Sequence, residues 1–308
     1  MTTAITIGMI IIYVAIMMGI GVYTARQTRS VSDFVLGSHS VGSWLTAFAY
    51  GTSYFSAVVF IGYAGQFGWT YGVSAAWVGV GNALLGSLLA WIVLGRRTRI
   101  MTQSLGAKTM PEYFEKRWNS KGLKIATALI VFVFLIPYTA SVYNGLSRLF
   151  NMAFQIESEG AYKIIIIVMA LLTAIYVILG GYAATAINDF IQGIVMLIGI
   201  AAVVICAIQN QGGLTSALAA LGEIEVNGKT NTLNSVFGPD PLNLLGVVIL
   251  TSLGTWGLPQ MIHKFYAIKS ENDIKKGAVI STVFALIVAG GSYLLGGFDR
   301  LFCTLTED

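Results

Sequence analysis

This sequence contains a series of long apolar runs, which almost no charged residue interrupts. Each run holds about 20 residues, enough for a helix to cross a hydrocarbon core of about 30 Å. Only 10% of the 308 residues are Asp, Glu, Lys or Arg, and the mean hydropathy is +0.76. A soluble domain carries roughly 25% charged residues, and a disordered chain is more polar still. We therefore expect an all-α integral membrane protein.

Eight membrane-spanning helices are predicted from these runs, within a single transmembrane domain that covers residues 1–308. The predicted spans are 5–24, 42–66, 73–95, 121–150, 161–180, 188–209, 242–266 and 276–298. Between the third and fourth spans, residues 110–118 are typical of a short interfacial helix that starts at Pro111, with aromatic and basic anchors. The only long polar stretch is the loop 210–241, so no separate soluble domain is expected.

The basic residues indicate the orientation in the membrane. If the N-terminus lies outside, 14 of the 18 Lys and Arg residues fall in inward segments. The outward segments keep only Arg148, Lys163, Lys229 and Arg300. Because cytoplasmic loops are enriched in Lys and Arg, both termini are predicted to lie outside a plasma membrane. The first span has no basic segment before it and is expected to stay as an uncleaved anchor.

Two spans carry polar interruptions. The second contains Tyr-Gly-Thr-Ser-Tyr-Phe-Ser at residues 50–56, where glycine weakens a helix and the hydroxyl side chains compete for backbone hydrogen bonds. The seventh contains Gly254, Gly257 and Pro259, and Pro259 lacks an amide donor. Both helices are predicted to be broken. The charge bias makes them run in opposite directions, as in inverted-repeat transporters, so the repeats are expected to start at 42 and 242.

Broken helices in a bilayer need partners for their unwound backbone. Main-chain carbonyls near Thr52 and Phe55, with the hydroxyls of Ser53 and Ser56, offer the hard oxygen ligands that sodium prefers, and half-helix ends suit an anionic group of a substrate. The alternative is a packed, kinked helix whose Ser and Thr side chains bond back to their own turn. The residues by themselves leave both interpretations open.

Several motifs, taken in order, resemble the sodium:solute symporter family, whose known branches move proline, pantothenate and sugars. The resemblance runs from about residue 5 to about residue 300. It is carried by residues 32–37, 51–56, 60–62, 72–77, 110–114, 180–192 and 258–265. It implies a leucine-transporter-type fold of two inverted five-helix repeats behind a leading helix. In this chain those parts would be the leading helix 5–24, the first repeat 42–209 and the start of the second, 242–298.

The resemblance also implies a sodium site. The family's main-chain sodium ligands match Thr52 and Phe55, and Asp189 matches a carboxylate on the cytoplasmic exit route for sodium. A different interpretation of Asp189 is a helix N-cap, together with Asn188. The family's other sodium ligands lie on a helix that would follow residue 300. The chain is therefore expected to be truncated after the eighth helix, with an incomplete second repeat, and to be an inactive fragment by itself.

Substrate-facing positions follow from the same resemblance. They match Ser56, Thr251 and Thr255, with Trp256 as a neighbour, and we add Ser53 and Tyr54 from the first interruption. The proline branch has an acidic residue where this chain has Tyr54, and the sugar branch has glutamine where it has Val59. The substrate is therefore expected to be another amino acid or a small carboxylate.

Other functional classes lack support in the sequence. There is no phosphate-binding loop, no zinc-ligand spacing and no nucleophile triad, so neither an enzyme nor a cofactor beyond the coupling ion is expected. The expected partners are sodium, a small solute and the lipid bilayer, with no nucleic acid. The resemblance implies sodium-coupled solute import by alternating access. A transporter-fold sensor that signals without flux and a proton-coupled permease are the alternatives.

Overall fold

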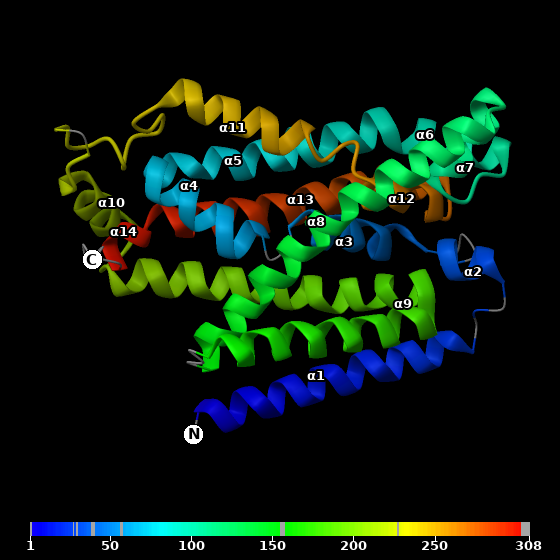
Figure 1. Ribbon diagram of the computed structural model, residues 1–308. Helices are drawn as coiled ribbons and strands as arrows, with labels where there is room; N and C mark the ends of the chain where they lie inside the picture. The colour runs from blue at the N-terminus through cyan, green and yellow to red at the C-terminus, as the bar shows by residue number, and fades with distance from the viewer. Residues whose placement is uncertain are drawn as a thin grey trace. The chain divides into compact units, whose positions relative to one another are not determined.

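The computed structural model describes residues 2–26, 28, 30–37, 41–55, 58–154, 158–226 and 228–302, and in these ranges it is helical without any β-strand (Figure 1). In chain order the elements are α1 (Thr2–Ala25), α2 (Val31–Leu36), α3 (Ser43–Tyr54), the π-helix η2 (Val58–Tyr63), α4 (Ala64–Tyr71), the 3-10 helix η3 (Gly72–Ala75), α5 (Ala76–Gly81), the π-helices η4 (Asn82–Leu89) and η5 (Trp91–Gly95), α6 (Arg96–Leu105), α7 (Met110–Trp118), α8 (Lys121–Phe154), α9 (Glu159–Asn210), α10 (Leu214–Glu223), α11 (Pro241–Leu253), α12 (Pro259–Ala267), α13 (Glu271–Gly297) and α14 (Asp299–Phe302).

Five helical stretches in the described ranges are long and apolar enough to cross a membrane. They are Ile7–Ala25, Ala64–Leu105, Lys121–Phe154, Gly160–Asn210 and Glu271–Gly297. These stretches account for six of the eight predicted spans, because Gly160–Asn210 contains both the fifth and the sixth. The two remaining spans, 42–66 and 242–266, are those for which the sequence predicts an interruption.

Gly181 separates the fifth and sixth spans. Its φ of 59° and ψ of −150° are non-helical and lie in a region that residues with a Cβ rarely adopt. A Cβ there would also lie 2.7 Å from the main-chain oxygen of Phe34. Helical structure resumes directly after Gly181, so the predicted loop before residue 188 is wrong. A single glycine, without any polar linker, is sufficient to end one helix and begin the next.

The chain divides into two compact units, each built from three segments. The first unit comprises Met1–Ala49, Leu94–Ile191 and Ile262–Ile274. The second comprises Tyr50–Val93, Gln192–Met261 and Lys275–Asp308.

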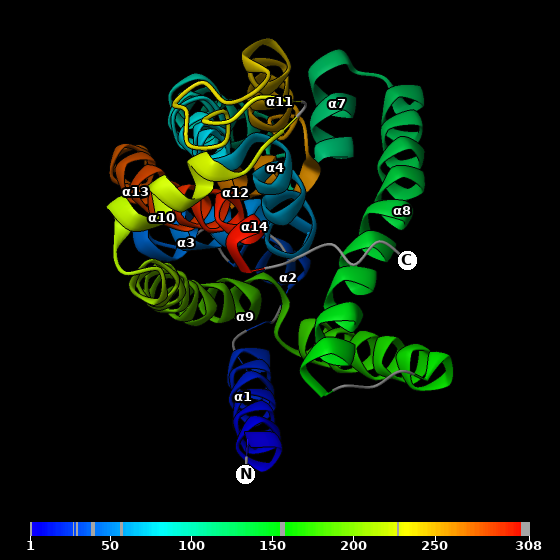
Figure 2. The ribbon, with the colours of Figure 1, turned by 90° about the vertical axis from the view of Figure 1, so that its left-hand side faces the viewer.

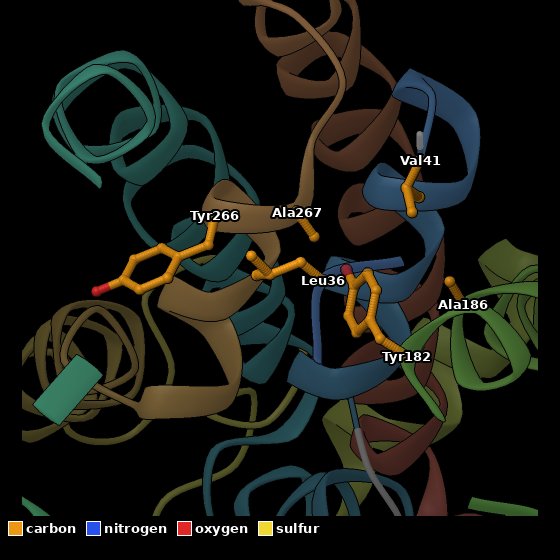
Figure 3. Close-up of a cluster of buried hydrophobic side chains, with 6 residues drawn as sticks. All are labelled: Leu36, Val41, Tyr182, Ala186, Tyr266 and Ala267. Atoms are coloured by element: carbon orange, nitrogen blue, oxygen red, sulfur yellow. The ribbon is translucent and has the colours of Figure 1, made fainter. Parts of the chain in front are cut away.

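The core of the first unit brings together residues from α2, α9 and α12. Its buried side chains are Leu36, Val41, Tyr182, Ala186, Tyr266 and Ala267. Figure 3 shows Leu36 next to Tyr182 and Ala267. The chain around Val41 is fixed by main-chain bonding, because the Val41 oxygen accepts from the Lys269 amide at 3.0 Å.

In the same unit α7 begins at Met110 after the N-cap Thr109, close to the predicted start, and packs along α8.

The second unit has its own core and closely packed helices. Ala217, Leu221, Leu233 and Phe298 are buried where α10 and α14 lie side by side (Figure 2). Glycine allows close backbone contact between α5 and α13, since a Cβ on Gly79 would lie 2.5 Å from the amide nitrogen of Gly290. Because apolar surface gains little from association inside a bilayer, such small-residue contacts supply much of the packing energy between helices. Gly79 and Gly290 therefore mark a packing surface between α5 and α13.

Candidate functional site

The first predicted interruption is present in the structure. Helix α3 ends at Tyr54, and Phe55 forms a bend while its amide still donates to the Gly51 oxygen at 2.9 Å. The next described helix, η2, begins at Val58. Ser56, which the sequence assigns to the substrate site, lies outside the described residues. The glycine and hydroxyl residues of this stretch therefore end a helix inside an apolar segment, as expected from their competition with helical bonding.

The second predicted interruption is also present. Helix α11 ends at Leu253, and residues 254–257 form turns before α12 starts at Pro259. The Trp256 amide donates to the Leu253 oxygen at 3.1 Å. Pro259 suits the first turn of a helix, where no amide donor is required, so the proline starts α12 without a lost hydrogen bond.

Polar side chains from the helix ends next to both interruptions converge within the second unit on Asn82, at the start of η4. Its Oδ1 accepts from the hydroxyls of Tyr54 at 3.2 Å, Thr251 at 3.1 Å and Ser252 at 3.1 Å. The Tyr54 hydroxyl also lies 2.9 Å from the main-chain oxygen of Thr251. Asn82 is buried, with 1% of its surface exposed. Helix α11 runs beside α5 and η4, which allows these contacts (Figure 1).

Thr255 and Trp256 lie in the second interruption, as the sequence predicts. The Trp256 indole N–H donates to the Leu85 oxygen at 3.0 Å, which ties the interruption to η4. The Thr255 hydroxyl donates to the Ser252 oxygen at 3.0 Å, and the Thr251 hydroxyl reaches the Val247 oxygen at 2.9 Å. These two bonds to nearby main-chain oxygens are what the kinked-helix interpretation predicts, and they coexist with the contact between Thr251 and Asn82.

The predicted sodium residues of the first interruption belong to the same unit. Thr52 and Ser53 are half-buried in the last turn of α3, and Phe55 is buried. The Phe55 ring stacks on Tyr54 with ring centres 4.5 Å apart. Within the described ranges no three His, Cys, Asp or Glu side chains gather as a divalent-metal site needs. The oxygen atoms near this interruption come from the main chain and from hydroxyl groups.

Asp189 belongs to the first unit, where it pairs with Lys264. The ammonium Nζ lies 3.5 Å from Oδ2 of Asp189 and 5.2 Å from the centre of the Tyr182 ring. Both side chains are largely buried, with 8% of Lys264 and 20% of Asp189 exposed. The N-cap interpretation of Asp189 is wrong, because α9 is helical from Tyr182 through this residue. Its carboxylate therefore serves an ion pair inside the protein.

Sequence reasoning missed Asn82, Ser252 and the partner of Asp189. Asn82 had a detectable signal, because an amide side chain inside an apolar span is costly unless it finds partners there. Lys264 has a weaker signal, because it lies near the end of the predicted span 242–266, where an inward basic residue is common. Neither signal predicts which residue is the partner.

Comparison with known proteins decides the family. The family model described as "Sodium:solute symporter family" matches residues 34–306. This chain belongs to that family. The resemblance of the sequence motifs is thereby confirmed. Sodium:solute symporters are transporters with several membrane-spanning helices, in agreement with the apolar helices of this structure.

Two sodium/proline symporters of Staphylococcus aureus, from strains JH9 and USA300, are among the relatives of this symporter-family chain. Each is 33% identical over 294 residues, which cover 94% of this chain and 55% of the relative. The chain thus spans about half the length of these curated relatives. The fold matches a solved Na+-coupled sialic acid symporter in a substrate-bound, outward-open state, with a TM-score of 0.71 and 16% identity. That match covers 100% of this chain and 63% of the other, and confirms the predicted leucine-transporter-type fold.

Proposed function

We propose that the protein acts as a sodium-coupled secondary symporter that imports an amino acid or a small carboxylate by alternating access. The observation that carries this proposal is the contact between the helix ends at the two interruptions, where the hydroxyl of Tyr54 at the end of α3 lies 2.9 Å from the main-chain oxygen of Thr251 in the last turn of α11. Interrupted helices at the midplane are where secondary transporters bind their ions and substrates. Family membership supports the same class of activity.

The sodium part of the proposal rests on the first interruption. We assign main-chain oxygens of Thr52 and Phe55 as sodium ligands, because these residues lie at the end of α3, and carbonyl oxygens at the ends of interrupted helices coordinate sodium in secondary transporters. Asp189 is proposed to attract sodium that leaves toward the cytoplasm. Since Asp189 is already paired with Lys264, a departing ion has to share the carboxylate with the ammonium group.

The solute part rests on the hydroxyl groups. Ser53, Tyr54, Ser56, Thr251 and Thr255 are proposed to face the solute, because hydroxyl donors suit the acceptor oxygens of a carboxylate. Trp256 is also assigned to the solute site. Its indole N–H already donates to Leu85, so the ring face is what it offers to the apolar part of a solute. We place the protein in the plasma membrane with both termini outside.

An uptake assay in proteoliposomes tests the proposal. Radiolabelled amino acids and short carboxylates are offered under an inward gradient of sodium, potassium or choline. Because the chain spans 55% of its relatives, the assay compares it with the same chain joined in frame to the remaining C-terminal part of the S. aureus sodium/proline symporter. Uptake that requires sodium in either protein supports the proposal. Equal uptake with all three cations contradicts sodium coupling, and a pH gradient then tests the proton-coupled alternative.

A pair of threonine variants tests the assignment of the site. Thr251 and Thr282 are both half-buried, and each donates to the main-chain oxygen four residues earlier. Only Thr251 also contacts Asn82. Thr251→Val is expected to raise KM for the solute about tenfold, the effect of losing roughly 1.4 kcal/mol of binding. Thr282→Val is the matched control and should leave KM unchanged; equal effects of the two variants would count against the site.

A further inference from the structure

The buried side chain of Asn82 has hydrogen-bonding partners next to both interruptions. It lies in η4, on neither interrupted helix, and is almost completely buried. One hydroxyl from the end of α3 and two from the last turn of α11 donate to its single amide oxygen, and these donors are 28, 169 and 170 residues away in the sequence. A third segment of the chain thus joins the ends of two broken helices.

The amide oxygen has more donors than it can accept fully. It carries two lone pairs, whereas three hydroxyls lie within 3.2 Å of it. Two of the three have another acceptor at 2.9 Å: Tyr54 reaches the main-chain oxygen of Thr251, and Thr251 reaches that of Val247. Ser252 is fully buried beside Asn82. The hydroxyl of Tyr54 or Thr251 can therefore rotate away from Asn82 and still donate to a main-chain oxygen.

We propose that Asn82 is a positioning residue that holds the second interruption against the first through Tyr54, Thr251 and Ser252. When no solute is bound, the amide oxygen of Asn82 accepts hydrogen bonds from hydroxyls that would otherwise point toward a solute. When an acceptor oxygen of the solute arrives, Tyr54 or Thr251 turns its hydroxyl toward it while Ser252 keeps its bond to Asn82. This last step rests on the proposed transport function, whereas the positioning role does not.

A double-variant cycle on the 308-residue chain in detergent micelles tests the positioning role. Asn82→Leu keeps the approximate volume but removes the acceptor, so the melting temperature should fall by about 2–6 °C. In a Ser252→Ala background the same substitution should cost clearly less, because one stranded hydroxyl is absent. Ser87→Ala is the matched control, since Ser87 also lies on η4 and is buried but bonds to Ser281 at 2.8 Å. Asn82→Leu should cost the same with or without Ser87→Ala.

A labelling experiment gives a readout that general destabilisation would not reproduce. Thr255→Cys is introduced into the chain with Cys206→Ser and Cys303→Ser, and its reaction rate with a water-soluble methanethiosulfonate is measured. Thr255 is half-buried in the second interruption, so a loosened interruption should react about 5-fold faster. Asn82→Leu is expected to give this increase, Ser87→Ala to leave the rate unchanged, and Asn82→Asp, which keeps an acceptor oxygen, to restore most of the original rate.

Additive melting shifts for Asn82→Leu and Ser252→Ala, together with an unchanged labelling rate, would overturn the positioning role. Neither measurement requires uptake, so this result would leave the transport proposal standing. Conversely, uptake independent of sodium would contradict the sodium-coupled transport proposal, but it would not contradict the positioning role that the double-variant cycle tests. If both proposals hold, Asn82→Leu should raise KM for the solute more than it lowers the maximal rate, because the solute then meets donors in the wrong places.

Discussion

The hydroxyl of Tyr54 lies 2.9 Å from the main-chain oxygen of Thr251, and 197 residues of chain separate the two. Tyr54 is the last residue of α3, and Thr251 lies in the last turn of α11. Each interruption therefore has the other as a hydrogen-bonding neighbour. A disturbance at one of them is expected to reach the other through this contact.

Removing the Tyr54 hydroxyl tests that contact. Tyr54→Phe keeps the ring stacked on Phe55 but takes a donor from Thr251 and Asn82, so we expect a loss of about 1–2 kcal/mol in the free energy of unfolding. Chemical denaturation in micelles measures it. Tyr50→Phe is the control, because the buried Tyr50 hydroxyl donates to the Gly86 oxygen at 3.0 Å. Both variants should lose stability, but only Tyr54→Phe should raise KM in the uptake assay; a KM effect of Tyr50→Phe would argue against a special role for Tyr54.

Glycine packing between α5 and α13 gives a second prediction. Gly79→Ala places a methyl group against the backbone of Gly290, which cannot move aside as a flexible side chain would. We expect a loss of about 1–3 kcal/mol in the free energy of unfolding. Gly246→Ala on α11 meets open space, and there alanine should be neutral or stabilise by about 0.5–1 kcal/mol. Thermal unfolding of both variants measures these changes, and an equal loss of stability in the two would contradict the packing argument.

The ion pair between Lys264 and Asp189 gives a third prediction. Lys264→Met leaves a largely buried carboxylate without its ammonium partner, which should cost about 3 kcal/mol in the free energy of unfolding. Adding Asp189→Asn removes the stranded charge, so the double variant should recover most of that loss. The free energies of unfolding of the two single variants and the double variant measure the coupling. Purely additive losses would mean that the two groups do not stabilise each other.

Asp299 gives a prediction for pH. Burial raises the pKa of this carboxyl to about 6 from its ordinary value of 3.8, so the folded protein binds a proton that the unfolded chain releases. The resulting stabilisation is fully present below about pH 3.8 and is lost as pH rises through 6. Because the carboxyl is only half-buried, solvent reduces the effect to about 1–2 kcal/mol. Asp299→Asn should gain that amount at pH 8 and little at pH 4.

Melting curves of the chain and of Asp299→Asn at pH 4, 6 and 8 check this expectation. The difference between the two proteins should grow from pH 4 to pH 6 and then stay constant. A difference that is largest at pH 4 would show that the folded state favours the charged carboxylate. That result would reverse the sign of the argument.

Much of the fold is encoded locally. Apolar runs of about 20 residues define six helical spans, and the glycines, hydroxyls and Pro259 mark both interruptions, because helix propensity and missing amide donors act within a few residues of the chain. The break itself follows the predicted end of the fifth span at residue 180, but the sixth span, predicted to begin at 188, begins directly after Gly181. Glycine alone ended that helix, and the polar residues Asn188 and Asp189 continued the next one.

The amino-acid pattern alone indicates a multi-span helical membrane protein of the sodium:solute symporter family with two broken helices. The packed helices then show that Asn82 receives hydroxyls from the helix ends at both breaks and that Asp189 is paired with Lys264. Helix formation and membrane insertion depend on neighbouring residues. The partners of a buried polar group depend instead on which helices pack together, and here they come from 28 to 170 residues away in the chain.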